Sequence, residues 1–376
     1  MSEQRVGNKR CADVAIVGAG VIGSAIAYTL SRATALRVVV VEREVPGCEA
    51  SNAAAGVLAV ASGHARQGVL LDLRRRSAAM FPGLVEELEE ETGVQLGYRR
   101  DGLISLAFSE TEAAALQDLV QHRNAQGLRG EMLSRGEVQE LEPAVSSRVC
   151  AAALFPDDRS INNERLVAAL VRGAQRRGVE FRLHSPVQSL STEGGTVRLQ
   201  LGSGPLEAGV AVVAAGAWSV ELLAHLGVKV PLRPARGEMA AVQSHDWTLR
   251  HTVTADPGYL VPRGGGEVLI GSTTAFVGFD AHVTPQGVAT LLANAEAMVP
   301  KIGGTVPLRS WAGLRPCPTI RRPIIAFLPG LDNVLLATGH HRNGILLAPI
   351  TAQLVTELIT GTVSTVPMRP FGYRRH

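Results

Sequence analysis

A glycine-rich turn near the start of the chain has the residue types that bind a phosphate group. Residues 12–32, ADVAIVGAGVIGSAIAYTLSR, contain an apolar run, then Gly18, Gly20 and Gly23 in the spacing GxGxxG, then a second apolar segment. In this arrangement the first glycine permits a tight turn, the second lets backbone approach a pyrophosphate, and the third lets helix and strand pack closely. The phosphates would lie at the helix N-terminus, where free N–H groups and the helix dipole favour negative charge.

An acidic residue ends the next apolar segment. Residues 37–42, RVVVVE, place Glu42 24 residues after Gly18, where a carboxylate can accept hydrogen bonds from ribose hydroxyls. The pattern therefore predicts a dinucleotide site. An acidic residue argues against the 2′-phosphate of NADP but does not distinguish NAD from FAD. The following loop, residues 46–60, consists mainly of small residues and would let backbone approach a bulky planar ligand.

Two further groups of polar residues are candidates for a binding site. Residues 337–351, ATGHHRNGILLAPIT, change from polar to apolar, which predicts a loop and a helix N-terminus facing an anionic or polar group. Arg315 stands between Leu314 and Pro316 in an apolar strand, and a buried arginine needs an anionic partner. Taken alone, Arg342 and Tyr259 are better interpreted as a surface arginine and a core tyrosine.

The order of the elements predicts a mixed α/β fold in which a Rossmann-like nucleotide domain is assembled from discontinuous segments. Helical spacing of apolar residues is found in 69–92, and Ser109 with Glu112 has the spacing of a capping box before another helix. Mostly antiparallel strands are expected between 238 and 318. We expect residues 1–90, 151–226 and 318–376 to form the nucleotide domain, and 91–150 and 227–317 to form the substrate domain.

Composition excludes several classes of protein. The 376 residues are 46% hydrophobic with 40 glycines, which is typical of a globular chain, and no dense basic run indicates nucleic-acid binding. Four scattered cysteines, with no CxxC pair, argue against a metal site and suit a reduced, cytoplasmic protein. The apolar stretch 14–30 follows two basic residues, but Asp13 and three glycines favour a buried strand and helix over a membrane segment.

Six segments together resemble the D-amino acid oxidase family of flavoproteins, and within it the glycine oxidases of the thiamine pathway. They extend from residue 14 to residue 349, so the resemblance covers almost the whole chain. They are VAIVGAGVIGSAIAY, SNAAAGVLA, VVAAGAWS, YLVPRGGGEVLIGSTT, WAGLRP and GHHRNGILLAP.

The resemblance implies FAD bound without a covalent link, and it implies which residues would hold it. Different segments of the chain would contact the pyrophosphate, the adenosine and the two sides of the flavin. The implied cofactor residues are Gly18, Gly20, Val21, Ile22, Gly23, Glu42, Arg43, Ala50, Ser51, Ala55, Gly56, Val57, Val187, Gly216, His340, His341, Arg342, Asn343, Gly344, Ile345 and Leu346.

The same resemblance implies a site for the carboxylate of an amino acid, which an arginine can hold with two parallel bonds. Arg315 matches the family's carboxylate-binding arginine, Arg342 a second arginine, and Tyr259 a tyrosine that contacts the carboxylate. Thr274 stands where the family often has methionine, and His341 where it commonly has phenylalanine, which would change the polarity of the pocket.

Two other positions also bear on the flavin. Ile320 and Arg321 replace a typical Asp-Gly, which would alter a turn near the flavin. Cys317 lies close by, but its spacing does not match the cysteine that binds flavin in related sarcosine oxidases. We interpret Cys317 as a packed thiol.

The implied reaction is oxidative deamination of glycine, sarcosine or a small D-amino acid to a 2-oxo acid, ammonia and hydrogen peroxide, with O2 as second substrate. The alternative is a related dehydrogenase, of the D-amino acid dehydrogenase or hydrogen cyanide synthase type, that passes electrons to another acceptor. A flavin-containing binding protein without turnover is a third possibility, which retention of Arg315 and Tyr259 argues against. The family also implies a homo-oligomer, a tetramer.

Overall fold

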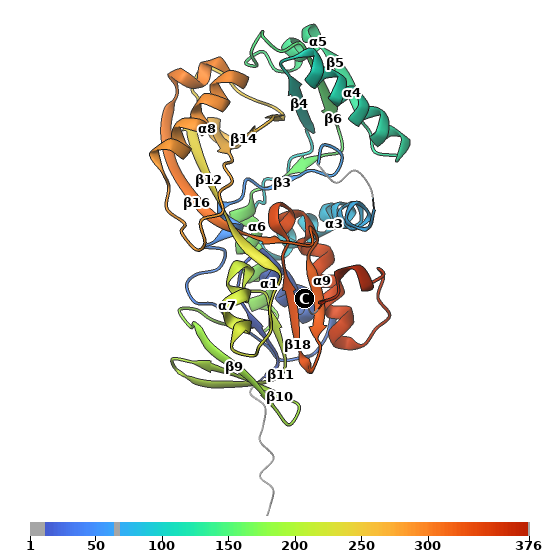
Figure 1. The fold of residues 1–376 in the computed structure, drawn as a ribbon, viewed down its shortest axis with the longest axis vertical. Helices are drawn as coiled ribbons and strands as arrows, with labels where there is room; N and C mark the ends of the chain where they lie inside the picture. The colour runs from blue at the N-terminus through green and yellow to red at the C-terminus, as the bar shows by residue number, and fades with distance from the viewer. Residues whose placement is uncertain (1–11, 64–67, 375–376) are drawn as a thin grey trace, which may run out of the picture.

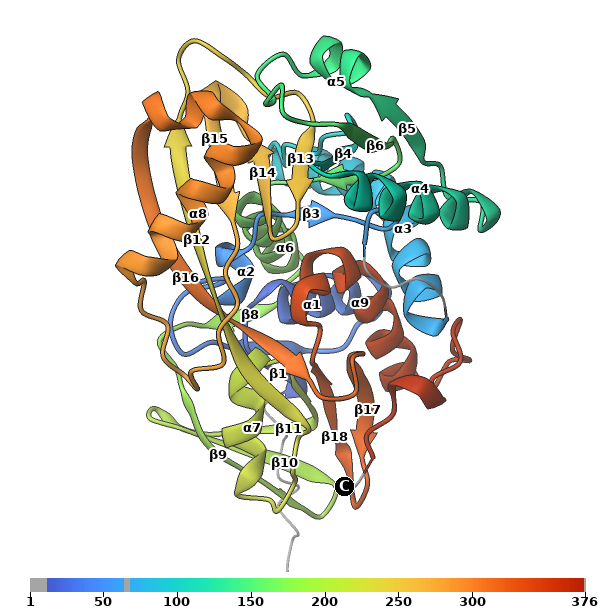
Figure 2. The ribbon, with the colours of Figure 1, turned by 45° about the horizontal axis from the view of Figure 1, so that its top comes forward.

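The computed structural model describes residues 12–63 and 68–374. Two sheets of eight strands form its two halves, and the views in Figures 1 and 2 show helices between and around them. A small third sheet pairs β3 (Val57–Leu58) with β7 (Arg159–Ser160). The mixed α/β class predicted from the sequence is confirmed.

The first sheet has the order β17-β18-β11-β1-β2-β8, and β1 is parallel to both of its neighbours. Its central strands are apolar runs that are buried on both faces, as parallel strands between helical layers are. Strands β9 and β10 extend from β11 as an antiparallel hairpin. The bounds are β1 Ala12–Val17, β2 Val38–Val41, β8 Glu180–Arg182, β9 Val187–Glu193, β10 Thr196–Leu201, β11 Gly204–Val213, β17 Ile324–Leu328 and β18 Leu331–Thr338.

One layer of helices packs against this sheet. Helix α1 lies beside α6 and α9, and α3 packs against both α6 and α9. The layer joins segments from the two ends of the chain, which is why the blue and red helices lie together in Figure 2. The bounds are α1 Val21–Ala33, α3 Val69–Thr92, α6 Asn163–Arg176 and α9 Gly344–Thr360; the short helices α2 Ala50–Ala53 and α7 Ser219–Ala224 lie elsewhere.

The second sheet has the order β16-β12-β15-β14-β13-β4-β6-β5. All of its strand pairs are antiparallel except β13 with β4. The bounds are β4 Leu103–Ala107, β5 Glu131–Ser134, β6 Ala151–Phe155, β12 Leu232–Gln243, β13 Thr252–Ala255, β14 Gly258–Pro262, β15 Glu267–Gly271 and β16 Val306–Pro318, with helices α4 Glu110–Ala125, α5 Arg135–Leu141 and α8 Pro285–Met298.

The predicted division into domains stays a prediction, and the strand pairing bears on one boundary. Residues 151–226 were assigned to the nucleotide domain, yet β6 at the start of this range pairs with β4 and β5 of the second sheet. The segment that enters the first sheet begins later, with β8. Strands β12 and β16 are long and extend toward the first sheet, where the end of β16 packs against the short helices η1 (Gly216–Trp218) and η4 (His341–Asn343).

Two local predictions concern helix ends and the apolar stretch near the N-terminus. The side chain of Ser109 accepts the Glu112 N–H at the start of α4, which confirms the cap. The stretch 14–30 forms β1 and α1, as predicted. A different stretch, His341–Thr360, is long and apolar enough by composition to cross a membrane, but 67% of its apolar window is buried within the protein. Because it packs against α1 and α3, we assign it as a core helix.

Candidate active site

A cavity of about 900 Å³ lies between the two sheets and is lined by residues of both. At one end are Gly18, Gly20 and Glu42 of the first sheet and its loops. At the other end are Tyr259 and Arg315 of the second sheet.

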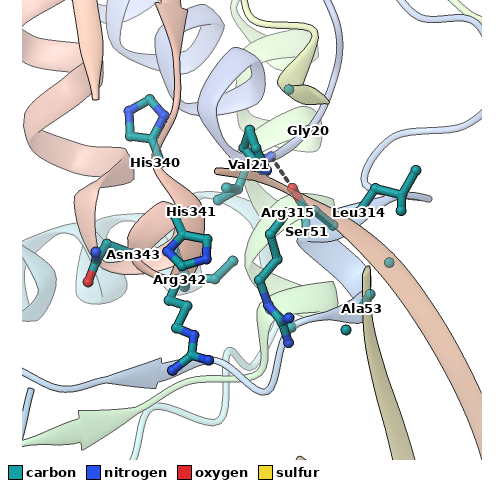
Figure 3. A pocket seen from close by; sticks show the side chains of 18 of the residues that line it. Gly20, Val21, Ser51, Ala53, Leu314, Arg315, His340, His341, Arg342 and Asn343 are labelled. Carbon is teal, nitrogen blue, oxygen red and sulfur yellow. Dashed lines mark hydrogen bonds between the residues drawn. The ribbon is translucent and has the colours of Figure 1, made fainter. Parts of the chain in front are cut away.

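The glycine turn leaves no side chain in front of helix α1. Gly18 has φ +101°, and a Cβ there would lie 2.8 Å from the Ala214 carbonyl oxygen. A Cβ at Gly23 would lie 1.9 Å from the Gly18 oxygen, so the third glycine serves helix–strand packing. The N-cap residue of helix α1 is Gly20, which has no side chain to cap the helix. The first N–H of the helix, from Val21, donates instead to Ser51 Oγ of the following loop at 2.9 Å (Figure 3). A pyrophosphate can therefore approach the backbone here.

Glu42 lies at the end of β2 and is largely buried. Its carboxylate accepts the Ala19 N–H at 2.7 Å and the Glu44 N–H at 3.0 Å, which fixes it beside the glycine turn. Next to it, Arg43 forms an ion pair with Glu49 and lies over the ring of Trp218, 3.8 Å from its centroid. These contacts hold the cavity wall at the end where an adenosine would lie.

The small residues of the loop after β2 are needed for close packing of backbone. Gly56 has φ +67°, and a Cβ there would lie 1.9 Å from the Ile161 carbonyl oxygen. A Cβ on Gly313 of β16 would lie 2.5 Å from the Cβ of Ala53. The loop is therefore packed between two other segments while its inner face lines the cavity.

Arg315 extends from β16 into the second end of the cavity. Its Nη1 donates to the Thr273 carbonyl at 3.1 Å and its Nη2 to Ser272 Oγ at 2.8 Å. Burial lowers the pKa of Arg315, and Tyr259 opposes that shift. Within the described part of the chain Arg315 forms no ion pair with a carboxylate, so a ligand carboxylate would be its first anionic partner.

The loop before α9 brings His341 and Arg342 to the side of the cavity that holds Arg315, as Figure 3 shows. Arg342 is exposed, and its Nη2 donates to Thr274 Oγ1 at 3.0 Å. His341 has φ +51°, and burial together with Arg342 and Arg315 lowers its pKa to about 4. Its Nε2 is buried and has no hydrogen-bond partner among the described residues. His341 is therefore neutral near pH 7.

His340 faces away from this group and into the protein. It is 3% exposed, its Nε2 lies 3.0 Å from Thr351 Oγ1, and burial lowers its pKa to about 3. Tyr259 lies on β14, where its ring covers the backbone of Gly271 and its hydroxyl donates to Met239 Sδ at 3.4 Å. Both residues line the cavity, but only Tyr259 adjoins Arg315.

The cavity brings together all but two of the residues that the sequence predicts to bind the cofactor or the substrate. Gly23 lies behind the glycine turn, for the packing reason given above, and Thr274 is exposed and contacts Arg342 instead. Arg321 has φ +56°, so the turn keeps a conformation that favours glycine although arginine stands there. Cys317 does not line the cavity, in agreement with a packed thiol.

Several lining or supporting residues were not predicted. Ser272 and Thr273 bind the Arg315 guanidinium, and a Cβ on Gly237 would lie 2.1 Å from it, so a larger residue at that position would displace the guanidinium. The Trp218 ring packs against the Arg43 guanidinium, and Arg74 of α3 also lines the cavity. Within residues 12–63 and 68–374, no group of three or more His, Cys, Asp or Glu residues is placed to hold a metal ion.

The comparisons with known proteins agree with this geometry. Residues 13–358 match the family of FAD dependent oxidoreductases named DAO. The chain is 36% identical to a glycine oxidase of Geobacillus kaustophilus over 97% of each chain. It is 35% identical to a bifunctional ThiO/ThiG protein of Synechocystis, over 92% of this chain and 51% of that one. A crystal structure of the Geobacillus kaustophilus glycine oxidase superposes with a TM-score of 0.94 and 35% identity, over 97% of this chain and 99% of the other.

The residues present fit FAD. The start of α1, the glycine turn and Glu42 provide a site for a dinucleotide. From there the cavity continues toward Arg315 and has room for a ring system. The family match spans most of the chain and includes both sheets. The chain therefore belongs to the DAO family of FAD dependent oxidoreductases and is a homologue of the glycine oxidases.

Proposed function

We propose that this protein catalyses the FAD-dependent oxidative deamination of glycine, or of a similar small amino acid such as sarcosine or a small D-amino acid. The products are the 2-oxo acid, hydrogen peroxide and ammonia, with methylamine in place of ammonia when the substrate is sarcosine. Bound FAD would supply the redox chemistry of this reaction, which is hydride transfer from the substrate α-carbon followed by transfer of both electrons to O2. Water hydrolyses the resulting imine.

The observation that carries the proposal is Arg315. It is a cavity-lining arginine with a lowered pKa, its two terminal nitrogens are held in place by Ser272 and Thr273, and no carboxylate of the described residues neutralises it. A guanidinium fixed in this way can bind a carboxylate with two parallel bonds. Tyr259 is positioned to add a third contact, and Arg342 a second positive charge.

We assign the remaining predicted residues to the cofactor. The start of α1 would receive the pyrophosphate, Glu42 the ribose, Val187 the adenine, and the loop 340–346 the flavin ring. These roles are supported by the shared cavity that the residues line. We propose noncovalent binding, since Cys317 does not reach the cavity wall.

The chain supplies positioning more than proton transfer. Among the residues that the structure describes, no carboxylate is paired with a histidine at the cavity end around Arg315, and His341 is neutral, with a pKa of about 4. The substrate amine would react in its neutral form, held by its carboxylate so that the α-carbon faces the cofactor. Correct placement of two reacting groups can supply about 7–11 kcal/mol of a barrier.

We further propose a role in making the thiazole of thiamine, a cytoplasmic location and a homo-oligomer, a tetramer. The ThiO/ThiG relative supports the first of these. The free thiols of Cys48, Cys150 and Cys317 support a reducing compartment. Light scattering of the purified protein would measure the oligomeric state.

A peroxide assay over a panel of small amines tests the function. We expect peroxide with glycine, sarcosine or D-alanine, and none with ethylamine, which has no carboxylate for Arg315. Turnover that reduces an artificial dye but forms no peroxide would instead support the dehydrogenase alternative. A flavin-containing protein with neither activity would contradict the proposal.

A further inference from the structure

Arg74 is a buried arginine whose role the proposed reaction does not explain. It lies in the first half of α3, it is 7% exposed, and it lines the cavity close to Gly63. The next two residues, Arg75 and Arg76, are exposed on the opposite face of the same helix. Only the first of three consecutive arginines therefore faces the cavity.

Its hydrogen bonds are incomplete. Nη2 donates to the Asn343 side-chain oxygen at 2.6 Å, while Nε and Nη1 are buried and have no partner among the described residues. The nearby Arg123 is a matched contrast. It is completely buried too, but its Nε, Nη1 and Nη2 bond to the Ala61 carbonyl, the Gln126 side chain and the Gly63 carbonyl. A purely structural arginine in this region is thus fully bonded, and Arg74 is not.

The charge of Arg74 is also uncompensated. Burial lowers its pKa to about 10, Arg123 adds to that shift, and Asp158 opposes it. Asp158, however, is engaged by the N–H groups of Val60, Ala61 and Ser62 and by the Ser62 hydroxyl. No carboxylate among the described residues forms an ion pair with Arg74. Burying a cation without an anionic partner is costly, so the site favours an anion.

The position of Asn343 shows where that anion would lie. Asn343 immediately precedes α9, whose first turn, Gly344 to Leu346, lines the same cavity without a side-chain cap. The positive end of the α9 dipole and the Arg74 guanidinium therefore act on one region. Arg74 and the proposed substrate arginines are held by different partners: Arg74 bonds to Asn343, whereas Arg315 bonds to Ser272 and Thr273 and Arg342 bonds to Thr274.

We propose that the Arg74 guanidinium, whose buried Nε and Nη1 have no partner among the described residues, lies behind the electron-rich pyrimidine edge of the flavin and stabilises the negative charge that the ring gains on reduction. The inference rests on the proposed FAD chemistry. The two electrons come from the substrate, and the charge they leave on the ring is balanced by Arg74 together with the start of α9. Arg74 is thus a positioning and electrostatic residue that sets how readily the cofactor is reduced.

Arg74→Met in the FAD-loaded protein tests this, with Arg76→Met as the matched control on the exposed face of α3. Two readouts are measured besides turnover: the midpoint potential of the bound flavin, and the dissociation constant of sulfite, which adds to electron-poor flavins and leaves negative charge on the ring. We expect Arg74→Met to weaken sulfite binding at least tenfold and to lower the potential by about 30 mV or more, the equivalent of tenfold for a two-electron couple. Arg76→Met should change neither.

Arg74→Lys should restore most of the effect and Arg74→Gln little, since only lysine keeps the charge. Removing an uncompensated buried cation should not prevent folding. If Arg74→Met does not hold FAD, the same measurements are made on Arg74→Gln. Unchanged potential and sulfite affinity in the variant measured would overturn the inference.

Two other outcomes would also overturn it. A folded Arg74→Gln protein that has lost its flavin would show that Arg74 serves to retain the cofactor. A variant in which only the KM for glycine rises would show that Arg74 serves the substrate carboxylate. Failure of the wild type to oxidise any amine would count against the proposed function instead.

Discussion

The two ends of the cavity are built by different means. At the proposed nucleotide end, backbone groups and absent side chains line the cavity: Gly18 and Gly20 leave space, and Glu42 is bonded by two N–H groups of neighbouring residues. At the proposed substrate end, the side chains of Arg315, Arg342 and His341 line the cavity. The described residues give the two arginines no carboxylate partner there and leave a buried nitrogen of His341 unbonded.

This difference indicates at which end the polar groups have their partners within the protein and at which end a ligand would supply them. A satisfied backbone turn is stable by itself and requires only that nothing fill it. A buried guanidinium without an anionic partner, such as that of Arg315, is costly, and that cost is offset when an anionic ligand arrives. Changes at the nucleotide end should therefore act on cofactor content, and changes at the substrate end on turnover.

Filling the glycine turn should have the largest effect. Gly20→Val places a branched side chain at the start of α1, where a Cβ already lies 3.1 Å from Ser51 Oγ and where the pyrophosphate is expected. We expect complete loss of FAD, measured by absorbance of the purified protein. Gly83→Val, at an open position in α3, is the control and should keep its flavin. Normal flavin content in Gly20→Val would mean that the cradle lies elsewhere.

Removing the Arg315 guanidinium should reduce turnover but leave FAD in place. Leaving a substrate carboxylate unpaired in a partly desolvated site should cost about 2–5 kcal/mol, which corresponds to a loss of roughly 30- to 5,000-fold in kcat/KM for glycine. Arg315→Lys should recover only part of this, since an ammonium group cannot make two parallel bonds. Arg309→Ala, on the exposed part of β16, serves as control. Full glycine turnover in Arg315→Ala, or loss of its flavin, would remove the distinction between the two ends.

Acid should destabilise the protein through His340. In the folded state burial lowers the pKa of His340 to about 3, whereas in the unfolded chain it is about 6.5. Between pH 6.5 and pH 3 the unfolded chain therefore binds more protons than the folded protein. The contribution of His340 to stability is therefore lost as pH falls through this window, by on the order of 3 kcal/mol at pH 4. His341, whose pKa is lowered to about 4, adds a loss that is common to the wild type and both variants below. Chemical denaturation at pH 7 and pH 4 measures the loss. It should be smaller in His340→Asn and unchanged in His245→Asn, an exposed control; equal losses in all three would exclude His340 as the cause.

The smallest effect is expected at His341. Phenylalanine replaces a buried nitrogen that has no partner, so His341→Phe should stabilise the protein by about 1 kcal/mol and change kcat/KM for glycine by less than tenfold. Thermal unfolding and steady-state kinetics check both values. A destabilised variant, or a much larger loss of turnover, would show that the nitrogen serves the substrate.

The nucleotide end could be predicted from the sequence because its determinants are local. The turn from Gly18 to Gly23 and the carboxylate at Glu42 lie within one strand–helix–strand unit, whose packing the spacing of glycines and apolar residues describes. The position of β6 could not be predicted in the same way. Its apolar residues suit either sheet, and pairing with β4 and β5 depends on long-range contacts.

At the substrate end, Arg315 was identifiable because it interrupts an apolar strand, whereas Arg342 and Tyr259 required the family resemblance. Arg74 was missed because it opens a run of three arginines that reads as a solvated surface. Its helical spacing was the available signal, since it shares a buried face with Ser77 and Phe81. Ser272 and Thr273 gave no signal, because their role depends on the path of β16 beside them.

Anaerobic addition of glycine to the purified yellow protein tests the central claim most directly. We predict that the flavin absorbance is lost, that air restores it, and that each glycine consumed yields one hydrogen peroxide and one ammonia. Ethylamine, which offers Arg315 no carboxylate, should leave the spectrum unchanged. A flavin that glycine, sarcosine and D-alanine all fail to reduce would contradict the assignment of this cavity as an amino-acid oxidase site.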